Sequence, residues 1–234
     1  IQAPAAWDLS QGDGVVIAVL DSGVYGEHPD LSSKMVAGWN VISGNTDTVD
    51  INGHGTAVAG FVGAATDNAD GIASAGFNAK IMPVRITNSS DGYALYSDMA
   101  KGITWAADHG ANVANLSYRA FKSSTATAAA QYMRNMGGVV VVSAGNDNAD
   151  LGYSNNTSMI TVAATTSSDV RASFSNYGDY VDVTAPGASV LTTTKSGGYA
   201  NWSGTSFSAP LTAGVVGLIM SANPNLNPDQ IESV

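Results

Sequence analysis

Residues 15–20, VVIAVL, form an unbroken apolar run that leads directly into an acid, Asp21. Short β-branched runs of this kind recur along the chain and alternate with longer segments of helical period. A strand that is apolar on both faces is typical of a parallel sheet covered by helices on both sides. The sequence therefore predicts an α/β fold of three layers, doubly wound around a mostly parallel central sheet.

The same pattern places the other elements. The expected strands are 15–20, 79–86, 111–117, 138–145, 159–165 and 180–187, and the expected helices are 55–64, 95–109, 125–135 and 206–222. Asn227-Pro228-Asp229 has the cap, proline and early acid of another helix start. In parallel sheets of this kind, working residues lie at the carboxyl ends of the strands.

Composition narrows the class of protein. The 234 residues include 9 Lys and Arg against 19 Asp and Glu, a formal net charge of −10. A negative net charge disfavours nucleic acids and anionic membranes as binding partners. The apolar stretch 209–220 is shorter than the roughly 18 residues of a membrane span. The chain has no cysteine, which excludes thiolate chemistry and disulfides. Its length suits a single domain over 1–234.

Four Gly-flanked stretches carry reactive or polar side chains. Asp21 follows the first strand, His54 opens a helix in NGHGTAVAG, Asn146 follows VVVVSAG, and Ser206 lies in GTSFSAP. Taken singly, each has a simple structural explanation, as a turn acid, a surface histidine, a turn asparagine or a helix cap from Thr205 or Ser206. Taken together, they supply the nucleophile, base, orienting carboxylate and oxyanion donor of acyl transfer.

In this order, the stretches IAVLDSGV, NGHGTAVAG, VVVVSAGN and GTSFSAP resemble the four signature stretches of the subtilisin-like serine peptidases, the subtilases. The resemblance implies a subtilisin-like fold in which Ser206 attacks the scissile carbonyl and His54 acts as base and then acid. It further implies that Asp21 orients His54 and Asn146 stabilises the oxyanion. Ser208 is then a structural hydroxyl, and Pro210 is expected in the first helical turn, where a missing N–H costs little.

The resemblance also implies a substrate groove with two walls and a side-chain pocket. Its residues would be Gly92, Tyr93 and Ala94 on one wall, Leu116, Ser117 and Tyr118 on the other, and Ser143, Ala144, Gly145 and Gly152 around the pocket. Because the pocket residues are small, we expect large apolar side chains to be preferred before the cut. The chain departs from the family pattern at Tyr118-Arg119-Ala120, which is expected to narrow the groove or favour acidic substrate groups.

A calcium site is expected by resemblance at Asp30 and the turn 65–72, with Asp30, Ala65, Asp67, Ala69 and Ile72 as ligands. Carboxylate and carbonyl oxygens on a Gly-containing loop suit this hard cation. A solvated acidic turn is the alternative. No catalytic cofactor is expected.

The sequence thus favours a secreted serine endopeptidase of broad specificity, active at neutral to alkaline pH because His54 must be neutral to act as base. By resemblance, a monomer, an N-terminal pro-segment in the precursor, and peptide or protein substrates are expected, and both chain ends look trimmed. Two alternatives stay open. One is a processing peptidase that cuts after basic residues, suggested by Asp47, Asp50, Asp91 and Asp98, and the other is an inactive fold used for binding.

Overall fold

The computed structural model describes residues 3–234; residues 1 and 2, with which the predicted domain begins, lie outside this range. Its centre is a seven-stranded sheet in the order β2-β3-β1-β4-β5-β6-β7, and each pair of neighbours in it is parallel. The strands are β1 (Val16–Asp21), β2 (Trp39–Asn40), β3 (Lys80–Arg85), β4 (Val113–Leu116), β5 (Val139–Ser143), β6 (Ile160–Thr165) and β7 (Val183–Pro186).

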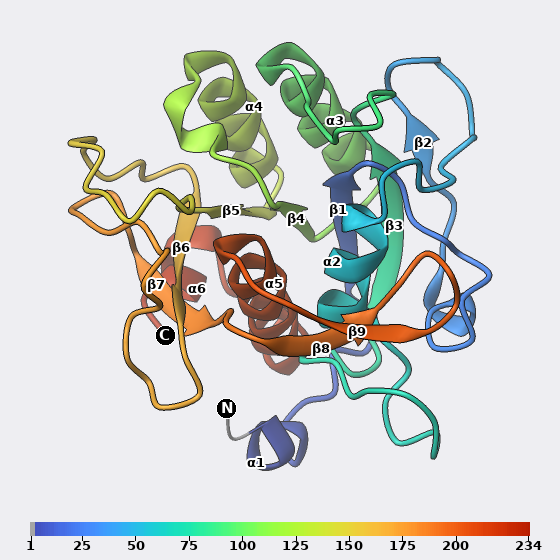
Figure 1. Ribbon diagram of the computed structural model, residues 1–234. Helices are drawn as coiled ribbons and strands as arrows, with labels where there is room; N and C mark the ends of the chain where they lie inside the picture. The colour runs from blue at the N-terminus through green and yellow to red at the C-terminus, as the bar shows by residue number, and fades with distance from the viewer. Residues whose placement is uncertain (1–2) are drawn as a thin grey trace.

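Helices cover both faces of this sheet (Figure 1). α3 (Tyr96–Asp108) and α4 (Ser124–Asn135) lie on one face, and α2 (His54–Gly63) and α5 (Thr205–Ala222) lie on the other, with α6 (Pro228–Glu232) beside α5. A short hairpin, β8 (Val190–Thr193) and β9 (Tyr199–Trp202), packs outside α2, and α1 (Ala3–Trp7) lies near the N-terminus. The predicted three-layer α/β fold with a parallel central sheet is confirmed.

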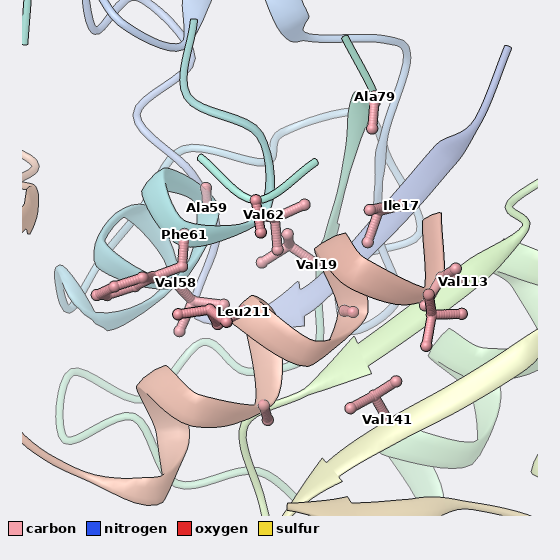
Figure 2. Packing of buried hydrophobic residues seen from close by; sticks show 14 of the residues in the cluster. Ile17, Val19, Val58, Ala59, Phe61, Val62, Ala79, Val113, Val141 and Leu211 are labelled. Carbon is pink, nitrogen blue, oxygen red and sulfur yellow. The ribbon is translucent and has the colours of Figure 1, made fainter. Parts of the chain in front are cut away.

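β1 explains why the run at 15–20 is apolar throughout. Ile17 and Val19 belong to the core beneath α2 and α5, while Ala18 and Leu20 belong to the core beneath α3 and α4. Figure 2 shows Ile17 and Val19 in the same apolar cluster as Val62 of α2. A strand buried on both faces has no position for a polar side chain until it ends, at Asp21.

The predicted elements match the observed ones to within three residues at each end. Sequence reasoning missed β2, α1, the hairpin and two 3₁₀ turns, η1 (Ser32–Lys34) and η2 (Ala120–Lys122). Most of these elements are two to five residues long, and β8 and β9 are half exposed, so hydrophobic periodicity is weak in them. The capping box predicted for the last helix is present at Asn227 and Gln230.

α5 is the long helix of the core. By length and composition it could cross a membrane, but 67% of its 18 residues are buried inside the fold. It begins at Thr205, one residue earlier than expected, and Pro210 is therefore its sixth residue, inside the helix. The expectation that Pro210 lies in the first turn is wrong. Because proline has no N–H, the carbonyl of Ser206, four positions before it, receives no helical hydrogen bond.

Candidate active site

The four candidate catalytic residues lie at the ends of buried elements on one edge of the sheet. Asp21 is the last residue of β1, and His54 is the first residue of α2. Ser206 is the second residue of α5, and Asn146 lies three residues beyond β5. Since the carboxyl ends of parallel strands meet at one edge, the fold gathers side chains that are up to 185 positions apart in the sequence.

Asp21 and His54 form a direct pair. His54 Nδ1 lies 2.9 Å from both carboxylate oxygens of Asp21, and Asp21 is fully buried while the His54 side chain is 24% exposed. Asp21 Oδ1 also accepts the N–H of Ser22 at 2.8 Å. A carboxylate next to Nδ1 favours the imidazole tautomer with its proton on Nδ1. Nε2 then has a free lone pair and can act as a general base.

The pair also sets the protonation of the imidazole. Burial alone lowers the pKa of His54, but the charge and hydrogen bond of Asp21, with a smaller contribution from Asp50, outweigh it and hold this pKa above the ordinary 6.5. The imidazolium that forms during proton transfer is thereby stabilised.

Asp50 is a positioning residue that sequence reasoning did not find. Its Oδ1 accepts from Ser22 Oγ, at 2.8 Å, and from the N–H groups of Asn52 and Gly53. Its Oδ2 accepts the N–H and hydroxyl of Thr56. A buried carboxylate at the amino end of α2 satisfies donors there and fixes the turn that presents His54.

Aromatic packing holds the imidazole next to α5. The ring centroid of His54 lies 5.6 Å from that of Phe207, the residue after Ser206. Phe207 in turn packs on Phe61 at 5.7 Å and on Trp202 at 5.5 Å. The phenyl ring of Phe207 is therefore part of the support for His54.

Ser206 is joined to Ser117 by two hydrogen bonds. Ser206 Oγ donates to the Ser117 carbonyl at 3.3 Å, and Ser117 Oγ donates to the Ser206 carbonyl at 2.8 Å. In a regular helix the second carbonyl would accept from residue 210, but Pro210 has no N–H. The Ser206 carbonyl is therefore free to accept the hydrogen bond from Ser117. The expected bond from Ser206 Oγ to His54 Nε2 is not among the hydrogen bonds of residues 3–234; in enzymes without substrate such bonds are often long.

Asn146 has an oriented carboxamide. Its Oδ1 accepts the N–H of Thr205 at 2.9 Å and the Thr205 hydroxyl at 3.0 Å. Nδ2 is the donor that remains, and it lies beside Gly204, where a Cβ would approach it to 3.4 Å. The predicted capping by Thr205 or Ser206 is wrong, because the cap position is Gly204 with no side-chain bond and Thr205 instead binds Asn146 and Gly145.

The predicted groove residues lie at the ends of β4 and β5 and in the loops that follow β3, β4 and β5. On the first wall Gly92 has φ +78, Tyr93 is exposed and Ala94 is buried. Tyr118 of the second wall donates its hydroxyl to the Gly92 carbonyl at 2.7 Å, so the two walls are tied together. Burial, with nearby carboxylates, raises the pKa of Tyr118, which keeps this donor protonated.

Around the predicted pocket, Leu116 ends β4 and Ser143 ends β5, and both are buried. The Ala144 carbonyl accepts from Asn176 Nδ2 at 3.1 Å, and Gly152 is exposed with φ +66. The opening expected at Gly145 is occupied, because Arg119 packs against its Cα.

Asp30 is fully buried and faces the loop 65–72. Its Oδ1 accepts from Asn68 Nδ2 at 3.0 Å and its Oδ2 from the Ile72 N–H at 2.9 Å. Gly71 has φ +62, and a Cβ there would lie 2.1 Å from the Tyr199 hydroxyl. Because a side chain has no room at this position, the loop can close tightly over the carboxylate.

The other predicted ligands are distributed as follows. The Ala65 N–H donates to the Asp30 carbonyl at 2.7 Å, whereas Asp67 and Ala69 are exposed, with positive φ. Asn68, which sequence reasoning did not include, is the side chain that reaches Asp30. Within residues 3–234, His, Cys, Asp and Glu side chains form no group of three that could hold a metal, so an ion here would depend on carbonyl and carboxamide oxygens.

The subtilase family model (Peptidase_S8: Subtilase family) matches residues 12–234. The chain belongs to the subtilase family. It is 43% identical over 227 residues to thermitase of Thermoactinomyces vulgaris, covering 94% of this chain and 80% of thermitase. Subtilases are the subtilisin-like serine peptidases, so the chain is a serine endopeptidase.

Two further comparisons extend this result. An extracellular protease of Xanthomonas campestris pv. campestris is 36% identical over 280 residues, which covers 98% of this chain and 48% of that protein. A protease structure from Pseudoalteromonas arctica has a TM-score of 0.88 at 34% identity, covering 99% of this subtilase and 84% of that chain. The fold is therefore shared with solved subtilases over nearly its whole length.

Proposed function

We propose that this subtilase hydrolyses peptide bonds through Ser206, His54 and Asp21, with Asn146 as an oxyanion donor. His54 Nε2 takes the proton of Ser206 as its Oγ attacks the scissile carbonyl and later gives the proton to the leaving amine. Asn146 Nδ2 and the backbone N–H of Ser206 donate to the oxyanion as it forms. The N-terminus of α5 adds the positive end of its dipole.

The observation that carries this proposal is the buried Asp21 carboxylate, which holds both of its oxygens 2.9 Å from His54 Nδ1. Burial of a carboxylate is unfavourable unless it is paired or hydrogen-bonded, and here the partner is a titratable imidazole. Titratable pairs of this kind are typical of catalytic sites. The carboxamide of Asn146 supports the proposal further, because both bonds to its oxygen turn its nitrogen outward.

The acids that suggested a preference for basic residues have partners of their own. Asp47 lies 3.4 Å from Arg85, and Asp98 binds Lys101 at 2.8 Å on its own helix. Asp50 is buried among donors at the start of α2. Asp91 is exposed, and its Oδ1 accepts the N–H of Tyr93. These contacts favour a broad endopeptidase over an enzyme that cuts after basic residues.

We further propose that the enzyme is secreted as a monomer after removal of an N-terminal pro-segment, with protein or peptide substrates. Support comes from the extracellular protease among its relatives. Mapping cleavage sites in mixed peptides tests the sequence-based expectation of large apolar residues before the cut. The side chains that pack beside Gly145 argue against that expectation.

We also propose that Asp30 and the loop 65–72 bind a structural calcium ion. A rotation of the Asn68 carboxamide by about 180° exchanges its oxygen and nitrogen and so brings the oxygen next to Asp30. Residues 67–73 line a polar recess beside Asn68. A buried carboxylate with carboxamide and carbonyl oxygens is a donor set that suits calcium.

The experiment for the catalytic proposal compares Ser206→Ala with the matched control Ser208→Ala in hydrolysis of a chromogenic peptide. Ser208 is buried and donates to the Ala185 carbonyl at 2.9 Å, so its loss should lower kcat only modestly. Loss of Ser206 should lower kcat by on the order of 10⁶, the size of effect known for a subtilisin nucleophile. Equal effects in two folded variants would refute the assignment and leave the inactive binding fold as the better explanation.

A further inference from the structure

Two chain segments flank Ser206 where a substrate residue must sit. They follow the neighbouring parallel strands β4 and β5, whose register pairs Leu116 with Val142. The Ser117 carbonyl lies 3.3 Å from Ser206 Oγ on one side, and the Gly145 N–H donates to Thr205 on the other. The family resemblance places the pocket for the side chain next to the attacked carbonyl between these two segments, 117–119 and 143–145.

Arg119 crosses this space. A Cβ on Gly145 would lie 2.5 Å from Asn176 Nδ2, 2.7 Å from Arg119 Cδ and 3.4 Å from Arg119 Cγ. The buried carboxamide of Asn176 and the aliphatic part of Arg119 therefore share the space beside the bare Cα of Gly145. The guanidinium continues past Gly145 and forms an ion pair with Asp147. The arginine thus begins on the segment after β4 and is attached to the segment after β5.

The attachment is itself anchored. Asn176 is fully buried; its Oδ1 accepts the Asp147 N–H at 2.8 Å and its Nδ2 donates to Asp147 Oδ2 at 3.2 Å. The same Nδ2 donates to the Ala144 carbonyl. Asp147 is therefore held in place. Its ion pair with Arg119 is half exposed, with 40% of the Arg119 and 51% of the Asp147 side chain open to solvent, so it orients the guanidinium but resists displacement of the arginine only weakly.

We propose that Arg119 is a size filter, which restricts the residue before the cut to small side chains. This inference rests on the proposed function. The space above Gly145 is filled by the enzyme's own side chain, so a small substrate side chain fits beside the arginine stem, whereas a phenyl ring must displace it. Since Asp147 compensates the guanidinium charge, selection is by size. The inference opposes the sequence-based expectation of a preference for large apolar residues.

The test measures kcat/KM for two peptides that differ only in having Phe or Ala before the cut. The wild type should favour Ala, and Arg119→Ala should raise the Phe-to-Ala ratio about tenfold or more, the usual effect of removing one or more methylenes from a pocket. Arg119→Met keeps most of the stem without the charge and should leave the ratio close to wild type. Asp147→Asn releases the guanidinium and should give an intermediate ratio.

Three outcomes overturn the inference. The first is an unchanged ratio in a folded Arg119→Ala variant, and the second is a wild type that already favours Phe. The third is a change in Arg119→Met as large as in Arg119→Ala, together with loss of cleavage after Asp or Glu, which would make Arg119 a charge selector. If the folded wild type cleaves neither peptide and does not react with an organophosphate, the proposed function fails and the size filter with it.

Discussion

Two buried aspartates, nine residues apart, show how the same side chain serves different purposes in this fold. Asp21 and Asp30 are both fully buried. Asp21 faces the imidazole of His54, a titratable group that is partly open to solvent. Asp30 faces the Asn68 carboxamide and the Ile72 N–H within a closed loop.

The difference lies in what compensates the carboxylate. A buried carboxylate must be paired or hydrogen-bonded, because an isolated one is strongly disfavoured. At Asp21 the partner can gain and lose a proton, so the pair can take part in proton transfer. At Asp30 the hydrogen-bond donors keep their protons, so the carboxylate orders a loop. Asp→Asn substitutions at the two positions should therefore have different consequences.

The largest effect is expected for Asp21→Asn. Removing the charge favours the wrong imidazole tautomer, and kcat should fall about 10⁴-fold, as it does when the corresponding change is made in other serine peptidases. The measurement is kcat on a chromogenic peptide, with circular dichroism to verify folding. A loss in kcat of less than tenfold would contradict the proposed difference between the two aspartates, since Asp21 would then have only a structural role, like Asp30.

The same variant has a pH signature. Because the pKa of His54 is raised, wild-type kcat/KM should fall as pH drops through a value above 6.5, and in Asp21→Asn the residual activity should persist to lower pH. The ion pair stabilises the folded state fully below the unfolded pKa of about 6.5 and is lost as pH rises through the folded pKa. The stability deficit of Asp21→Asn should therefore be larger at pH 5 than at pH 9.

A smaller effect, of a different kind, is expected for Asp30→Asn. Most activity should remain, while the loss of a charged acceptor for Ile72 and Asn68 should cost about 2 kcal/mol and lower Tm by roughly 4 to 8 °C. In the wild type, chelation should lower Tm by about 3 to 6 °C if free calcium stands near ten times Kd. Asp30→Asn should lose that response. A response of equal size in both proteins, or none in the wild type, would contradict the calcium proposal.

Much of the fold could be predicted because regular elements repeat. VVIAVL is apolar on both faces since β1 is covered on both faces, and Asp21, His54, Asn146 and Ser206 stand out because they follow or open such elements beside glycines. Family resemblance then assigned their roles.

What could not be predicted depends on individual side-chain contacts, many of them between residues that are far apart in the sequence. Asp50 accepts directly from N–H groups at the start of α2 and also from the hydroxyl of Ser22, which lies 28 positions away. Pro210 leaves the Ser206 carbonyl without its helical partner, and the bond that replaces it comes from Ser117, 89 positions away. By resemblance, Tyr118-Arg119-Ala120 is expected to narrow the groove or favour acidic substrate groups, but the contact of Arg119 with Gly145 depends on the direction of its side chain after β4, which no periodicity encodes.

The most direct test of the proposed catalytic site is covalent labelling by a serine-directed organophosphate, with the modified peptide identified by mass spectrometry. The site described above predicts a single modification on Ser206, together with its loss in a folded His54→Ala variant, because the hydroxyl is activated by that imidazole. Labelling of Ser117 or Ser208, or undiminished labelling of Ser206 without His54, would contradict it.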